Sequence, residues 1–178
     1  MSRENRKAAL VRAMADHVLA EGLGGVSLRP LASAVGTSDR MLLYYFPDKP
    51  ALIAAVLEEV AARMITLLEA VKAPEPVPAE VLEARLLPMV LDPAVWPFMQ
   101  LWLEMAAQAA RGDEACARVG EGIARGFVAW LEAQLDLADA SSRSAAALRL
   151  LMTIEGGVLL KSLGLSEGIA AIAAPRGG

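Results

Sequence analysis

Residues 27–53 read SLRPLASAVGTSDRMLLYYFPDKPALI, and this stretch decides the fold of the N-terminal part of the chain. Serine and aspartate often stand directly before a helix, because their side chains accept hydrogen bonds from the free N–H groups of its first turn. Three such residues predict helix starts here: Ser27 before 28–35, Ser38 before 39–45 and Asp48 before 49–72. Gly36 ends the first of these helices and Pro47 stops the second.

Apolar residues at helical spacing continue this pattern on both sides of the stretch. Leu10, Met14 and Val18 share one stripe, which predicts an amphipathic helix over 3–21. The proline-rich segment 72–79 predicts a break. Beyond it we expect helices over 79–91, 93–111, 113–136 and 142–163, a short helical piece near 166–173 and a frayed PRGG end. The predicted fold class is therefore all-α.

The composition limits the classes of protein to which the chain can belong. With 178 residues, 56% of them apolar, it forms one domain or two small ones that share a core. No apolar run reaches the roughly 18 residues of a membrane span, and the N-terminus lacks the apolar segment of a signal peptide. We therefore expect a cytoplasmic protein without membrane contact. The single cysteine, Cys116, and the single histidine, His17, predict no disulfide, no metal site and no cofactor.

Charge is distributed unevenly along the chain. The whole sequence has a net charge of −4, but residues 1–50 have a net charge of +2 and residues 51–178 one of −6. Only the N-terminal part is therefore expected to meet an anionic partner. We divide the chain into a head, residues 1–48, and a body, residues 49–178.

The two short helices of the head and their glycine turn form a helix-turn-helix arrangement. A short second helix of this kind fits the major groove of B-DNA, where side chains reach the base edges. Leu42 and Phe46 are four residues apart and are predicted to pack this helix onto its neighbours. The large side chains left for its outer face are Asp39, Arg40, Met41, Tyr44 and Tyr45.

The same stretch resembles the N-terminal DNA-binding region of the TetR family of transcriptional regulators. The residues that carry the resemblance are, in order, Ser27, the small residues 32–34, Gly36-Thr37-Ser38, Tyr44-Tyr45-Phe46 and Lys49. They cover under a third of the chain. Leu43 and Tyr45 depart from the pattern, because many members have tyrosine and histidine at these positions. The resemblance implies a helix-turn-helix head followed by a helical bundle for effector binding and dimerisation.

The resemblance also implies which residues touch DNA. Ser38, Tyr44, Tyr45 and Lys49 would contact phosphates with help from Ser27, whereas Arg40 and Met41 would face bases. Two alternatives stay open: the tyrosines pack beneath the head, and Arg29 is either a phosphate contact or a solvated residue. The complete predicted set is Ser27, Arg29, Thr37, Ser38, Arg40, Met41, Tyr44, Tyr45 and Lys49.

Helix 93–111 of the body is apolar on most of its surface, so we expect it to be buried. Its narrow polar stripe of Gln100, Glu104 and Gln108 faces either water or a cavity. The methionines and aromatic residues of the body are either plain core or the lining of an adaptable apolar pocket. The predicted effector pocket comprises Met64, Met89, Trp96, Met99, Gln100, Trp102, Glu104, Met105 and Phe127.

Helices 113–136 and 142–163 are expected to pair with those of a second copy, as the last two helices do in the TetR family. Gly122 and Gly126 would allow close backbone approach. One short recognition helix reads few bases, so a two-fold dimer would be needed to contact two half-sites, roughly 34 to 36 Å apart or more. The apolar faces expected to pair are Val119, Ile123, Phe127, Trp130 and Leu131 in the first helix, and Leu148, Leu151, Ile154 and Val158 in the second.

Together these features predict a homodimeric transcriptional repressor that a small apolar or amphipathic effector releases from a palindromic DNA operator. The alternative is a helical ligand-binding or interaction module that does not bind DNA. An enzyme is a third class, because residues 164–168 match the G-x-S-x-G pattern of hydrolases. No strand is expected before this motif and the only histidine is in the head, so no catalytic residue is assigned.

Overall fold

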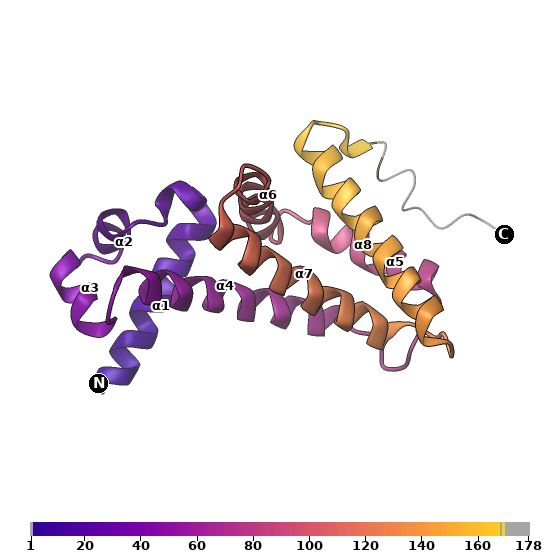
Figure 1. Cartoon of the computed structure of the whole chain (residues 1–178), viewed down its shortest axis with the longest axis horizontal. Coiled ribbons are helices and arrows are strands. Elements are labelled where there is room, and N and C mark those ends of the chain that lie inside the picture. Colours follow the sequence, from indigo (N-terminus) through magenta and orange to yellow (C-terminus); the bar gives the residue numbers. More distant parts are fainter. Residues whose placement is uncertain (1, 168, 170–178) are drawn as a thin grey trace.

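A computed structural model of the chain describes residues 2–167 and 169, and the described part is an all-helical fold (Figure 1). Its elements are α1 (Arg3–Glu21), the 3₁₀ helix η1 (Leu23–Gly25), α2 (Leu28–Ala34), α3 (Asp39–Tyr45), α4 (Lys49–Val71), α5 (Ala79–Leu91), α6 (Trp96–Ala110), α7 (Glu114–Gln134) and α8 (Ala140–Ser162). The all-α prediction is confirmed. The helix expected over 166–173 and the PRGG end lie largely outside the described residues.

The helices are arranged along one long axis. Figure 1 shows α1, α2 and α3 at one end of the molecule and α5 and α8 toward the other end, while the long α4 runs between them. In the body, α6 packs on α7, α5 packs on α8, and α7 packs on α8. The head therefore forms one end of the molecule, and α3 lies at the tip of that end.

Two of the three predicted helix caps form as expected. The Ser38 side chain accepts a hydrogen bond from the Met41 N–H, and Asp48 accepts one from Ala51. Ser27 also precedes its helix, but its side chain makes no capping hydrogen bond. The physical reason lies in the first turn of α2. Its third residue is Pro30, which has no N–H to donate.

Buried side chains form two clusters. The head cluster joins α1, α2 and α3 to the first half of α4, and one residue of α6, Leu101, also belongs to it. The body cluster is built from α4 to α8, with Leu82, Leu86 and Leu131 completely buried. Because α4 contributes to both clusters and α6 contributes Leu101 to the head cluster, the head is packed against the body rather than tethered to it.

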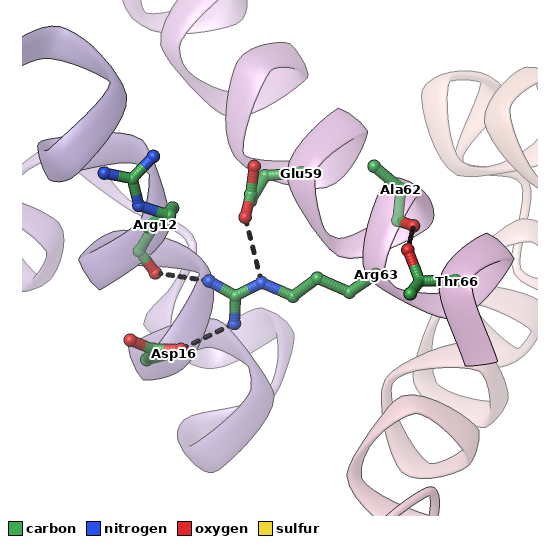
Figure 2. A network of polar contacts seen from close by, with 6 residues as sticks. All are labelled: Arg12, Asp16, Glu59, Ala62, Arg63 and Thr66. Carbon is green, nitrogen blue, oxygen red and sulfur yellow. Dashed lines mark hydrogen bonds and ion pairs between the residues drawn. The ribbon is translucent and has the colours of Figure 1, made fainter. Parts of the chain in front are cut away.

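A polar network fastens α4 to α1 on the outside of the head cluster (Figure 2). Arg63 of α4 donates to Asp16 at 2.5 Å, to Glu59 at 3.0 Å and to the backbone oxygen of Arg12 at 3.0 Å. Burial lowers the pKa of Arg63, but these hydrogen bonds and the two carboxylates outweigh it and raise the pKa above its ordinary value. The guanidinium therefore stays charged and links two carboxylates and a backbone oxygen.

The predicted break over 72–79 is confirmed, and the segment is held in place by α7. Val77 N–H donates to the oxygen of Gln134 at 2.8 Å, and the Val77 oxygen accepts from Asp136 at 3.0 Å. The buried side chain of Gln134 accepts from the Ala73 N–H at 3.2 Å. These bonds satisfy backbone groups that the prolines prevent from forming a helix.

The first turn expected in helix 93–111 is absent, because α6 begins only at Trp96. Asp92 instead closes a turn, in which its side chain accepts from Ala94 at 2.7 Å and its backbone oxygen accepts from Val95 at 3.0 Å. The expectation that this helix is buried holds only in part. Met99, Leu101 and Met105 are buried, but Trp96, Phe98, Trp102 and Leu103 are half-buried.

Among the described residues, no single helix is both long and apolar enough to cross a membrane. Helices α5 and α6 meet that test only as a pair, and they are bent by 91° at the break between them.

Candidate nucleic-acid interface

Helix α3 is anchored by two side chains and leaves its other faces open. Leu42 is 0% exposed and Phe46 is 2% exposed, and both belong to the head cluster. The predicted packing of these two residues is confirmed. Since they lie four residues apart on one side of a two-turn helix, Tyr44, which lies between them in the sequence, is on the opposite side. Gly36, with φ at +64°, makes the tight turn that brings α3 against α2.

The outward face of α3 combines a cation with large apolar and aromatic side chains. Tyr44 is 61% exposed, Met41 is 47% exposed and Arg40 is also exposed. Tyr45 is half-buried, and its ring meets that of Tyr44 edge to face at 5.2 Å between centres. The alternative that both tyrosines pack beneath the head therefore applies only in part to Tyr45 and not to Tyr44.

Two cations of α1 cover the aromatic end of α3, a feature that sequence reasoning missed. Arg3 donates to the backbone oxygen of Tyr44 at 3.2 Å, and its guanidinium carbon lies 4.8 Å from the centre of the Tyr44 ring. Lys7 Nζ lies 5.1 Å from the centre of the Phe46 ring. The basic N-terminal sequence was the available signal, but it could not show that these side chains reach a helix about 40 residues later.

The other predicted DNA-contacting residues surround this face at helix starts. Ser38 directly precedes α3, and its side chain is already used to cap it. Lys49 is exposed in the first turn of α4, and Arg29 is exposed in the first turn of α2. Ser27 and Thr37 are half-buried, each directly outside a helix or its cap. Helix starts present N–H groups and partial positive charge, so this arrangement suits phosphate oxygens.

The predicted effector residues lie in different surroundings. Met99 is buried in the body cluster, and Met64, Met89, Trp96 and Phe127 pack against it. Lys161 Nζ lies 4.1 Å from the centre of the Trp96 ring and donates to the Leu91 oxygen at the end of α5. Met105 is buried, whereas Gln100, Glu104 and Gln108 are exposed, so the polar stripe of α6 faces outward. These positions do not test the effector assignment, which stays a prediction.

One polar contact joins Trp102 to α8. Its Nε1–H donates to the Glu155 carboxylate at 2.7 Å, and both side chains are half-buried. Burial raises the pKa of Glu155, although the hydrogen bond from Trp102 works in the opposite direction. A carboxylate inside the body was not part of the predicted effector site, and the lone Glu155 in an apolar helix was the signal for it.

A groove of about 530 Å³ lies between α7 and α8 and opens to the surface. Its lining is Glu121, Ala124, Arg125, Val128, Ala129, Glu132, Ser144, Leu148 and Leu151, and none of these is a predicted effector residue. The apolar faces expected to pair with a second copy are divided. Val119, Ile123 and Leu148 are exposed, but Leu131, Ile154 and Val158 are buried in the chain's own body cluster, a correction to the predicted pairing faces.

The fold is similar to two solved structures of proteins described as transcriptional regulators. One is from Rhodococcus sp. Rha1, with a TM-score of 0.71 and 21% sequence identity over 94% of this chain and 91% of the other. The second is from Pseudomonas aeruginosa PAO1, with a TM-score of 0.67 and 24% identity over 97% of this chain and 88% of the other. No protein-family model and no curated protein sequence matches the chain. The chain thus shares the helical fold of these proteins along almost its whole length.

Proposed function

We propose that the chain is a DNA-binding transcriptional regulator of the TetR type, a homodimeric repressor without catalytic activity that works in the cytoplasm. A small apolar or amphipathic effector would release it from a palindromic operator. The observation that carries the proposal is the face of α3. A two-turn helix at the tip of the molecule is fixed by Leu42 and Phe46 and presents Arg40, Met41 and Tyr44 to the outside.

The charge and the helix starts support the same reading. The head has an excess of cations although the chain as a whole is acidic, and Arg29 and Lys49 lie in the first turns of α2 and α4. Cations and helix starts fix the register of a protein on the phosphate backbone, and residues on the outer face of a recognition helix select the bases. The similarity to the two regulators agrees with this assignment.

The effector would act by shifting a population. If it binds better when the two heads of a dimer have a spacing that does not fit the operator, DNA affinity falls by its preference for that state, typically about 1–3 kcal/mol. The proposed effector site is the predicted set around Trp102, where the Glu155 carboxylate adds one polar group to an apolar surrounding.

The first test is selection of bound duplexes from a random pool, followed by affinity measurements at several salt concentrations. The double variant Tyr44→Ala/Lys49→Ala should weaken binding to all sequences and reduce the salt slope by about one to two units, because phosphate contacts are lost. Arg40→Ala should also relax the base preference at one position of each half-site. Arg85→Ala, an exposed arginine of α5, is the matched control and should leave affinity and preference unchanged.

If the wild-type chain selects no duplex, or if all of these variants bind like the wild type, the DNA-binding assignment is wrong. The helical ligand-binding or interaction module would then be the better description of the chain.

A further inference from the structure

A carboxylate of the body bonds to the turn between α1 and α2. Glu104 of α6 accepts a hydrogen bond from the Leu23 N–H at 2.6 Å, across 81 residues of sequence. Leu23 is the first residue of η1, so its N–H has no acceptor within that short helix. The contact therefore joins a side chain of the body to a backbone group of the head.

Gly22, the residue before Leu23, leaves space for the same carboxylate because it has no side chain. Gly22 ends α1 with φ at +71°, a conformation that side chains disfavour. A Cβ atom on Gly22 would come within 2.6 Å of Glu104 Oε2 and closer still to Oε1. The Leu23 N–H and the missing side chain of Gly22 are thus two separate features that accommodate the Glu104 carboxylate.

The contact lies at a place where it affects the orientation of α3, the helix proposed to read DNA. The turn from Gly22 to Val26 is the connection through which α2 is attached to α1, and α2 packs on α3. The start of α2 has no side-chain cap of its own, since Ser27 makes none. Leu101, one turn earlier on α6, is buried in the head cluster, so the helix that carries the carboxylate is itself packed against the head.

We propose that Glu104 is a positioning residue, which fixes the α1–α2 turn and thereby the orientation of α3 relative to the body. This inference rests on the proposed function, because it assigns the carboxylate a part in DNA reading without contact to DNA. It also gives Glu104 a different role from the effector contact that its sequence position predicts. A shift of α6 would reach the head through this bond and through Leu101.

The experiment combines hydrogen exchange with duplex binding. In Glu104→Ala, the Leu23 amide should exchange about tenfold faster, because the turn opens more often. Affinity for the selected duplex should fall about three- to tenfold. The salt slope should stay that of the wild type, since no phosphate contact is lost. Glu104→Gln keeps an acceptor oxygen and should restore most of both properties.

Gln108→Ala is the matched control, because it removes an exposed polar side chain one turn after Glu104 on the same helix. It should leave Leu23 exchange and affinity unchanged. Gly22→Ala supplies an independent variant. In the wild-type background the new methyl group collides with the carboxylate, whereas in the Glu104→Ala background only the backbone strain remains, so its cost in thermal stability should be smaller.

Equal Leu23 exchange in Glu104→Ala and Gln108→Ala would overturn the proposal, and so would additive effects of Gly22→Ala and Glu104→Ala. A changed salt slope would show that the carboxylate acts through its charge and not through position. If no duplex binds the wild type, the proposed function fails, while hydrogen exchange and the Gly22 variants still decide whether Glu104 holds the turn.

Discussion

At the scale of single residues, the outer face of α3 depends on how Tyr44 is held. Tyr44 is 61% exposed, and an exposed tyrosine is free to adopt several orientations. Arg3 restricts it from one side by stacking on the ring while its guanidinium donates to the backbone oxygen of Tyr44, and Tyr45 meets the ring edge to face. A side chain whose orientation is fixed before binding loses less entropy on the DNA. In the proposed complex, Arg3 would thus hold Tyr44 ready for its contact with DNA.

We therefore predict that Arg3→Ala weakens duplex binding more than Arg6→Ala. Arg6 is an exposed cation of the same helix end, so the two variants remove the same charge from the head. The additional loss for Arg3 should be about two- to fivefold in Kd, the value of an exposed cation–π contact. Fluorescence anisotropy with the selected duplex measures both. Equal losses would mean that Arg3 contributes only charge.

At the scale of elements, the starts of α3 and α4 were predictable from the sequence, and the partners of the helices were not. Ser38 and Asp48 cap their helices through bonds within one turn, and such local bonds leave a direct sequence signal. The division of α7 between an exposed Ile123 and a buried Leu131 depends on where α6 and α8 pack. An apolar stripe shows that a helix face is covered but not which helix covers it.

The same argument explains which parts of the candidate site were predictable. The outward face of α3 follows from the spacing of Leu42 and Phe46, which is local. The covering of α3 by Arg3, the bond of Glu104 to Leu23 and the bond of Trp102 to Glu155 join residues 41, 81 and 53 positions apart. No periodicity in the chain encodes contacts at such distances.

The α6–α8 contact predicts a specific pH dependence of stability. Burial raises the pKa of Glu155 above its ordinary value of 4.5, so the folded state holds this proton more tightly than the unfolded state. The stability contributed by the protonated carboxyl is complete below that value and is lost as pH rises through the raised pKa. Glu155→Gln does not titrate, so its stability relative to the wild type should rise as pH rises from 4 to 7.

Urea unfolding of both proteins across this pH range measures the difference. Trp102→Phe keeps an aromatic ring but removes the indole N–H that favours the charged carboxylate. The stability of this variant should therefore fall more steeply with pH than that of the wild type. If the stability of Glu155→Gln relative to the wild type falls as pH rises, the hydrogen bond from Trp102, and not burial, determines the pKa of Glu155.

At the scale of the whole molecule, α7 and α8 carry several large apolar side chains that a monomer leaves exposed to solvent. Met152 is 73% exposed and Leu148 is 50% exposed, and Val119 and Ile123 of α7 are exposed as well. Leu159 and Leu163 extend the exposed residues along α8. Apolar surface gathered on neighbouring helices is typical of a protein–protein interface. If the chain reads a palindrome, as proposed above, the matching partner is a second copy.

We predict that Leu148→Glu/Met152→Glu is monomeric in sedimentation velocity, because pairing would bury two carboxylates without partners. Both side chains are exposed in the single chain, so circular dichroism should show unchanged helix content. The monomer should bind an isolated half-site about as well as one head of the wild type does. It should lose the added affinity for the full palindrome, because the heads on the two half-sites are no longer linked. Ile65→Glu, which places one such carboxylate on an exposed apolar position of α4, should remain dimeric. A wild type that sediments as a monomer, or a double variant that still pairs, would show that α7 and α8 do not form the interface.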